Sequence, residues 1–349
     1  METGCVQARW IPQLAAFVFF AFSTQALKAW PIPRGWELSI GLAEWGHWLA
    51  LLALLLIPLL RCFRAKAWLA LACGLLALPV LGAWRSDEGF SWLRLARGWA
   101  PGRAPETFSV PGGQALDLYR PTTSGAHPLV LVVHGGSWAR GSRKDFAALN
   151  HLLVERGMVV ASLDYRLAPQ HRFPEANLDL DAAHDWLLSR ASELGIDPRR
   201  TLWLGRSAGA HLALLQAYQR RPSRAVVAFY PPTDLLWSYQ HPSNPRVLDS
   251  CAAIRDFLGG PPEQLPLAYT QSSPLLEGRP VPTLMLHGLK DDLVFPEQSR
   301  RLARRLQGEG VAFELLEIPW ANHGCDINLA GPSGQLTTLA VLRFLQRWL

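Results

Sequence analysis

Charged residues are scarce in this chain of 349 residues, because Asp, Glu, Lys and Arg together make up only 18% of it. Hydrophobic residues make up 49%. This balance is apolar for a soluble protein, and it indicates that part of the chain spans a membrane. The remainder is long enough for one large domain with an N-terminal appendage.

Cysteines are few and scattered. The sequence has five, and none has the Cys-x-x-Cys or Cys/His spacing of a metal site. We therefore expect no metal ion and no other cofactor. A disulfide between Cys251 and Cys325 stays open, although no spacing supports it.

The pattern of a nucleic-acid-binding surface is also missing. The net charge is +6, but no stripe of Lys and Arg with interleaved aromatic residues is present. The arginines of residues 299–307 (SRRLARRLQ) fit the solvated face of one amphipathic helix. We expect no nucleic-acid partner.

Three long apolar stretches near the N-terminus account for the excess of hydrophobic residues. Residues 10–27, 45–60 and 67–84 contain no Asp, Glu, Lys or Arg, and the second stretch extends back to about residue 38. Each approaches the roughly 20 residues that cross a bilayer, and tryptophans lie near the ends. We predict a membrane region over residues 1–84 with spans at about 10–27, 38–60 and 67–84. The first stretch is alternatively a signal peptide.

The flanking charges bear on orientation. The loop between the second and third spans carries Arg61, Arg64 and Lys66, which favour the cytoplasm. A multi-pass protein with three spans then has its C-terminal domain outside the cytoplasm, and its spans contact membrane lipids. The arginines that follow the third span favour the opposite orientation. Glu44 and His47 lie at or inside the second span, where ionisable groups are costly. A functional role and a position near the interface explain them equally well.

The C-terminal part alternates between strand and helix patterns. Residues 85–108 have the composition of a linker, and residues 109–349 form the predicted domain. Its strands are expected at 128–133, 158–166, 201–204, 225–230, 283–288 and 313–319, with helices between them. Because these strands are apolar throughout, we predict an α/β fold with a mainly parallel sheet covered by helices on both faces. A Pro-rich interval at about 231–280 is predicted to form a small cap or insertion.

One short pattern in this domain points to chemistry. Residues 205–209 read GRSAG, so Ser207 lies between two glycines at the end of a predicted strand and the start of a predicted helix. That context is typical of a strained turn that projects a nucleophilic serine. A serine needs a base to take its proton, and the base needs an acid to orient it. Asp291 and His323 follow later strands, and the order serine, acid, histidine is that of α/β-hydrolases.

From about residue 111 to the C-terminus the chain resembles the α/β-hydrolase esterases and lipases of the hormone-sensitive-lipase-like and feruloyl-esterase-like group. The matching stretches are HGGSW (134–138), DYRLAPQHRFPEA (164–176), GRSAGAHLAL (205–214), HGLKDDLV (287–294) and NHG (322–324). The resemblance implies Ser207 as nucleophile, Asp291 as acid and His323 as base. It also implies an oxyanion hole formed by Gly135, Gly136, Ser137 and Ala208. The residues it implies for substrate binding are Trp138 and Arg206.

The chain departs from the family pattern at three positions. Ser137 occupies the position of the third glycine in the family's HGGG pattern. In the GDSAGG pattern, Arg206 replaces the acidic residue and Ala210 replaces the last glycine. Backbone amides survive these changes, so the departures bear on substrate choice. The HGG-x-W stretch also resembles arylformamidases, which cleave an N-formyl amide with the same triad.

Neighbouring polar residues have other readings. Asp292 is an alternative acid to Asp291, and Asp234 is expected to hold a loop. Asp164 is expected to pair with Arg166 beneath the site. His134 is predicted to order the oxyanion turn, and His211 to be a packing residue.

The sequence therefore predicts a membrane-anchored serine hydrolase that cleaves small-molecule carboxylic esters through an acyl-serine intermediate. Short to medium acyl chains are expected to be preferred over long ones. The cap is expected to line an acyl pocket with four aromatic residues: Trp237, Tyr239, Phe257 and Tyr269. The alternatives are an arylformamidase or peptidase on the same fold, and a catalytically silent binding module tethered to the membrane.

Overall fold

The computed structural model describes residues 3–26, 35–60, 63–86, 89–98, 102–221 and 223–349. The chain forms two compact units. The first unit combines residues 1–98 with 288–292 and 318–339, and the second combines residues 99–287, 293–317 and 340–349. Because this division follows contacts in space, the domain boundaries predicted along the chain stay predictions.

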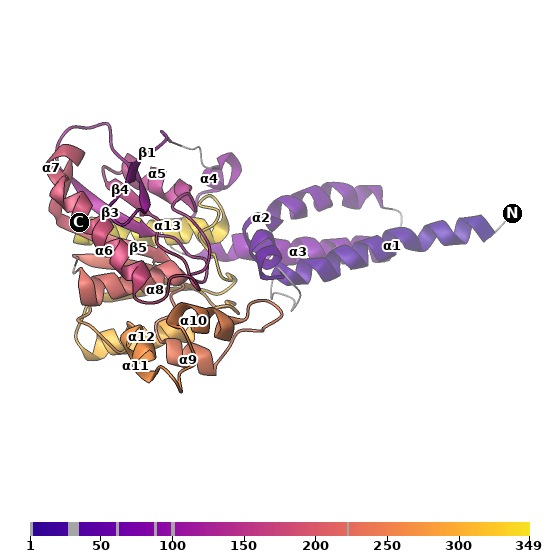
Figure 1. The fold of residues 1–349 in the computed structure, drawn as a ribbon. Coiled ribbons are helices and arrows are strands. Elements are labelled where there is room, and N and C mark those ends of the chain that lie inside the picture. The colour runs from indigo at the N-terminus through magenta and orange to yellow at the C-terminus, as the bar shows by residue number, and fades with distance from the viewer. Residues whose placement is uncertain (1–2, 27–34, 61–62, 87–88, 99–101, 222) are drawn as a thin grey trace. The chain divides into compact units, whose positions relative to one another are not determined.

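Three long helices dominate the first unit. They are α1 (Thr3–Ser23), α2 (Gly35–Leu56) and α3 (Phe63–Arg85), and α3 packs along both α1 and α2 (Figure 1). Gly46 allows α2 to approach α3 closely, because a Cβ atom there would lie 2.8 Å from Leu76 Cδ2. A short helix, α4 (Trp92–Arg97), follows within the predicted linker.

The predicted membrane spans are supported only in part. Within the described ranges, two helical segments, Glu37–Leu56 and Arg64–Arg85, are long and apolar enough to cross a membrane. Helix α1 occupies the first predicted span, but its crossing of a membrane stays a prediction. Residue Arg61, which entered the orientation argument, lies outside the described residues.

The second unit is built on an eight-stranded sheet with the order β1-β2-β4-β3-β5-β6-β7-β8. The neighbours β4, β3, β5, β6 and β7 run parallel, whereas β1 and β2 are antiparallel. The strands are β1 (Glu106–Ser109), β2 (Ala115–Tyr119), β3 (His127–Val133), β4 (Val159–Leu163), β5 (Ile196–Arg206), β6 (Ala225–Phe229), β7 (Thr283–Gly288) and β8 (Phe313–Ile318).

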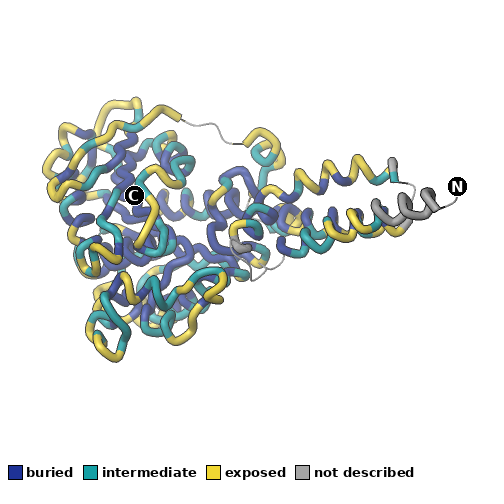
Figure 2. The backbone as a smooth tube through the Cα atoms, turned by 45° about the vertical axis from the view of Figure 1, so that its right-hand side comes forward, coloured by how far each residue is buried: buried dark blue, intermediate teal, exposed yellow. Residues whose placement is uncertain are grey.

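The helices after β3 alternate with these strands. They are α5 (Ala147–Glu155), α6 (Glu175–Ser189), α7 (Ala191–Leu194), α8 (Ala208–Leu215), α9 (Leu235–Gln240), α10 (Ser250–Leu258), α11 (Pro266–Gln271), α12 (Glu297–Gly308) and α13 (Pro332–Trp348). Consecutive residues are buried along β4, β6 and β7, so both faces of the sheet are covered (Figure 2). The mainly parallel sheet is therefore confirmed.

Two features differ from the sequence prediction. Strands β1 and β2 were not predicted, and they make the sheet mixed. Strand β1 is short and mostly exposed, so it lacks the apolar run that marks the central strands. Cys251 and Cys325 are both free thiols, so the disulfide left open by the sequence is not formed.

The topology places the candidate residues. Ser207 follows β5 directly, and the glycine turn of residues 134–136 follows β3. Because β3 and β5 are parallel neighbours, the segments after their carboxyl ends lie side by side, where sites form in such sheets. In the first unit, Asp291 and His323 follow β7 and β8.

Candidate active site

Ser207 occupies a strained turn between β5 and α8. Its backbone dihedrals are φ 53° and ψ −122°, a conformation that L-residues rarely adopt and that clusters at functional sites. The turn is fixed by the Ser207 amide, which donates to the carbonyl of Phe229 on β6 at 2.9 Å. The serine is therefore held at the tip of the turn, as the sequence predicted.

The two glycines around Ser207 are required by close backbone approaches. A Cβ atom on Gly205 would lie 2.2 Å from the carbonyl oxygen of Gly209, and one on Gly209 would lie 2.2 Å from that of His134. Heavy atoms do not approach this closely without a bond. The spacing of the motif thus reflects packing of the turn against the segment after β3.

That segment is the predicted oxyanion turn. A Cβ atom on Gly135 would lie 3.4 Å from Ser207 Cβ, which places this turn beside the serine. Gly136, Ser137 and Trp138 all have positive φ values, so the chain reverses sharply here. Ala208 is the first residue of α8, and the first amides of a helix have no partner within the helix. Backbone N–H groups are thus available on two sides of Ser207.

His134 supports the turn from behind. Its ring stacks on Tyr165 with centroids 4.3 Å apart, and its Nδ1 lies 2.8 Å from the carbonyl oxygen of Gly135. The Tyr165 hydroxyl donates to the His134 carbonyl at 3.1 Å. Burial lowers the pKa of His134, so the ring stays neutral at pH 7. These contacts fit the predicted ordering role.

In the first unit the structure brings Asp291 and His323 together. His323 Nδ1 lies 2.7 Å from Asp291 Oδ2, and the two side chains are buried. The segments that carry them are joined through the backbone, since Lys290 donates its amide to the carbonyl of Ala321 at 3.0 Å. This contact is the one expected between the acid and the base, and it involves Asp291, where the sequence left Asp292 as an alternative.

The predicted substrate residues Trp138 and Arg206 are both buried, at 5% and 2% exposure. The Trp138 indole stacks on Phe257 of α10 with centroids 4.6 Å apart and donates to His211 Nδ1 at 3.2 Å. The Arg206 guanidinium lies over the rings of Phe146 and Phe229. Direct substrate contact by either side chain stays a prediction.

The four predicted cap aromatics divide into two kinds. Phe257 and Tyr269 are each 1% exposed and belong to the hydrophobic core, whereas Trp237 and Tyr239 are half-buried on α9. Asp234 accepts from the Trp237 amide at the start of α9 and pairs with Arg301 at 2.8 Å. Asp234 therefore holds a loop, as expected.

The predicted pair between Asp164 and Arg166 is wrong. Asp164 instead pairs with Arg143, whose backbone amide also donates to it at 2.7 Å. Arg166 pairs with Asp179 and Glu175 of α6. Each residue instead pairs with a partner further away in the chain, which the local sequence does not reveal: Arg143 lies 21 residues from Asp164, and Asp179 lies 13 residues from Arg166.

Asn322 is a site residue that the sequence analysis did not single out. Its side-chain oxygen accepts from the His323 amide at 2.8 Å, and its Nδ2 donates to Ser39 Oγ on α2 at 3.2 Å. The only sequence signal is its place beside His323 in the NHG stretch.

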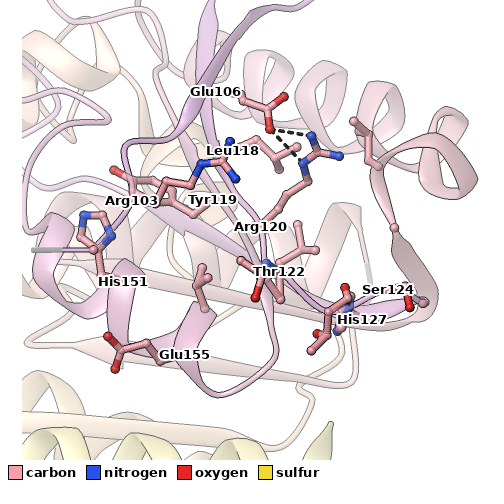
Figure 3. Close-up of a pocket in the computed structure, with 18 of the residues that line it drawn as sticks. Arg103, Glu106, Leu118, Tyr119, Arg120, Thr122, Ser124, His127, His151 and Glu155 are labelled. Carbon is pink, nitrogen blue, oxygen red and sulfur yellow. Dashed lines mark hydrogen bonds and ion pairs between the residues drawn. The ribbon is translucent and has the colours of Figure 1, made fainter.

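A cavity of about 680 Å³ lies elsewhere in the second unit (Figure 3). It is formed by segments that precede β3, β4 and β5, including residues 120–127 and 192–195. It therefore lies at the amino ends of the parallel strands, whereas Ser207 lies at the carboxyl ends. Arg120 and Glu106 form an ion pair across its wall. None of the predicted catalytic residues lines it.

No group of three or more His, Cys, Asp or Glu side chains that could hold a metal ion occurs within the described part of the chain. The expectation that no cofactor is needed stays a prediction.

Comparison with known proteins gives consistent results. Over 258 residues the chain is 30% identical to the esterase LipC of Mycobacterium tuberculosis. The matched region covers 67% of this chain and 62% of that protein, so this chain spans less than two thirds of LipC. Over 224 residues it is 32% identical to an ethyl acetate hydrolase of Pseudomonas putida, and the matched region covers 59% of this chain and 69% of that protein.

A solved structure agrees. The hyperthermophilic esterase from the archaeon Pyrobaculum calidifontis superposes with a TM-score of 0.63 at 25% identity, covering 73% of this chain and 86% of that one. The BD-FAE family model matches residues 116–306, which is more than half of the chain. The fold is thus that of α/β-hydrolase esterases, and the chain belongs to the BD-FAE family, among relatives that are carboxylic ester hydrolases.

Proposed function

We propose that this protein is a membrane-anchored carboxylesterase in which Ser207 is the nucleophile, His323 the general base and Asp291 the acid that orients the base. The observation that carries the proposal is the strained turn at Ser207, packed against the glycine turn that follows β3. The bond between His323 and Asp291 and the esterase relatives support it.

The chemistry follows from these groups. His323 Nε2 takes the proton of the Ser207 hydroxyl as its oxygen attacks the ester carbonyl. Asp291 holds His323 in the tautomer whose Nε2 accepts the proton, and it stabilises the imidazolium that forms. The proton passes to the leaving alcohol, and water then hydrolyses the acyl-serine by the same steps.

The negative charge that develops on the carbonyl oxygen is received by backbone amides of Gly136, Ser137 and Ala208, with Gly135 shaping the turn. One such donor typically contributes about 3 kcal/mol of transition-state stabilisation. Backbone donors need no particular side chain, so the replacement of a family glycine by Ser137 is compatible with this role.

Substrates are proposed to be esters with short to medium acyl chains. The Pseudomonas putida relative is an ethyl acetate hydrolase, which supports a small acyl group. Trp138 and Phe257 stack on each other beside the oxyanion turn, and we propose that they form an apolar wall on that side of the site.

Membrane anchoring is proposed on the two helical segments that are long and apolar enough to cross a membrane. Large apolar side chains on α2 are exposed, including Leu52 at 58% and Leu55 at 67%. A bilayer would cover such a surface. The basic residues Arg64 and Lys66 at the start of α3 favour a cytoplasmic position for the turn between α2 and α3. Helix α3 would then lead out of the cytoplasm, which supports an extracytoplasmic catalytic domain.

The test is hydrolysis of a p-nitrophenyl ester series from acetate to palmitate by the detergent-solubilised full chain. Wild type is expected to prefer the shorter esters. Ser207→Ala is expected to lower kcat on the order of a millionfold, whereas Ser189→Ala, at an exposed serine of α6, leaves it unchanged. Hydrolysis that persists in Ser207→Ala would refute the nucleophile. Activity on N-formylkynurenine but on no ester would replace the carboxylesterase by an arylformamidase.

A further inference from the structure

The N-terminal helices contact the segment that carries His323. Both belong to the first compact unit, which joins residues 1–98 to residues 318–339. A membrane anchor that serves only to tether an enzyme needs no such contacts. Helices α2 and α3 form several contacts of this kind.

The first contact is a hydrogen-bonded chain that ends at the proposed base. Ser39 on α2 donates to the Gln25 carbonyl at 2.7 Å and accepts from Asn322 Nδ2 at 3.2 Å. The Asn322 side-chain oxygen in turn accepts from the His323 amide at 2.8 Å. Ser39 and Asn322 are 2% and 3% exposed, so water does not readily replace these bonds.

The second contact is made by Glu44, one of the two ionisable residues in the second predicted span. Its side chain is 1% exposed, and its carboxyl oxygen Oε2 accepts from the Ser333 amide at 3.3 Å. Ser333 lies in the first turn of α13, where backbone amides have no partner within the helix. The Glu44 carbonyl also accepts from Asn328 at 3.3 Å. Glu44 thus ties α2 to the chain just after His323.

Packing reinforces both contacts. Gly324 follows His323 with a φ of +77°, and a Cβ atom there would lie 3.1 Å from Ile40 of α2. A Cβ atom on Gly82 of α3 would lie 2.4 Å from the Trp320 ring. Helix α2 therefore packs closely against the residue after His323, and α3 packs closely against Trp320, three residues before it.

We propose that the N-terminal helices are a working part of the active site, and that Ser39 is a positioning residue that acts on His323 through Asn322. This inference rests on the proposed function, because it takes His323 as the base. The relay fixes the backbone of His323 while Asp291 fixes its ring. A base held less firmly spends less time aligned with the serine hydroxyl, which lowers kcat and leaves substrate binding unchanged.

The test compares Ser39→Ala, Asn322→Ala and their double variant with wild type, each as the full chain in detergent. Turnover of p-nitrophenyl butyrate is measured per active site, with sites counted by fluorophosphonate titration so that unfolded protein drops out. Ser39→Ala is expected to lower kcat about tenfold with KM within about twofold. Because both residues act through one relay, the double variant should lose no more than Asn322→Ala alone.

Two further variants serve as controls. Ser39→Thr keeps a hydroxyl and is expected to recover most of the lost kcat. Leu52→Ala, at an exposed position of the same helix, is expected to leave kcat per site unchanged. An unchanged kcat per site in Ser39→Ala, or losses that add in the double variant, would overturn the positioning role. A wild type that neither hydrolyses the ester nor reacts with the fluorophosphonate would instead overturn the proposed function itself.

Discussion

At the scale of single residues, the position of the proposed acid distinguishes it from the carboxylate next to it in the sequence. Asp291 contacts His323 Nδ1 at 2.7 Å, and Asp292, the next residue along the chain, is half-buried. We expect Asp291→Asn to lower kcat about ten-thousandfold, because the amide stabilises the wrong histidine tautomer. Steady-state kinetics with p-nitrophenyl butyrate measure the effect.

The matched variant is Asp292→Asn, which makes the same chemical change one residue away. It is expected to keep kcat within a few-fold of wild type, since it is not the partner of His323 Nδ1. A larger loss in Asp292→Asn than in Asp291→Asn would assign the acid to Asp292.

His211 gives a prediction on pH. It is fully buried between Trp138, which donates to its Nδ1, and the Ser272 carbonyl, 2.5 Å from its Nε2. Burial lowers the pKa of His211 from 6.5 to about 4. Between these values the unfolded chain binds a proton that the folded chain does not. The free energy of unfolding therefore falls as pH falls from 6.5 towards 4, by up to about 3 kcal/mol from this group.

Thermal unfolding at pH 7 and pH 5 tests this contribution. The melting temperature of wild type is expected to drop more between the two pH values than that of His211→Gln, which cannot titrate. The difference between the two proteins isolates His211 from other groups, including His134, whose pKa is also lowered by burial. Equal drops in both proteins would refute the assignment.

At the scale of elements, the turn between β5 and α8 depends on the close approach of Gly209 to the segment that follows β3. A Cβ atom at Gly209 would lie 2.2 Å from the His134 carbonyl oxygen. We expect Gly209→Ala to separate the serine turn from the oxyanion turn, lowering both kcat and the melting temperature. Gly308→Ala is the control, because nothing lies within 4 Å of a Cβ atom at the end of α12. A full kcat in Gly209→Ala would contradict the need for this contact.

The serine turn was also what the sequence predicted best. A glycine on each side of Ser207, an apolar strand before it and a helix after it are local signals, and the structure places β5 and α8 there. The central strands were likewise predictable, because a strand buried on both faces is apolar throughout. Strand β1 was missed because it is four residues long and mostly exposed.

Other features depend on contacts between distant residues, which a pattern in the sequence does not reveal. Asp164 was predicted to pair with Arg166, but Arg143, 21 residues away, is its partner. The bond between Asn322 and Ser39 joins positions 283 residues apart. Neither residue type nor spacing announces such a bond.

At the scale of the whole molecule, the N-terminal helices carry the proposed membrane attachment. Among the described residues, exposed large hydrophobic side chains are concentrated on α1, α2 and α3, whereas few lie on the second unit. We expect the full chain to stay in the membrane fraction after washing with alkaline carbonate, because these apolar surfaces are stable only in lipid. Immunoblotting of pellet and supernatant measures this. Complete release into the supernatant would show that α2 and α3 are not membrane spans.

The most direct test of the central claim is to locate the covalent adduct of a fluorophosphonate probe on the full chain by peptide mass spectrometry. The phosphonate is expected on Ser207, on the peptide that joins β5 to α8. Labelling should be abolished in Ser207→Ala and strongly slowed in His323→Ala, which lacks the base. An adduct on another serine, or ester hydrolysis by a folded protein that the probe does not label at all, would contradict the assignment of Ser207 as the nucleophile.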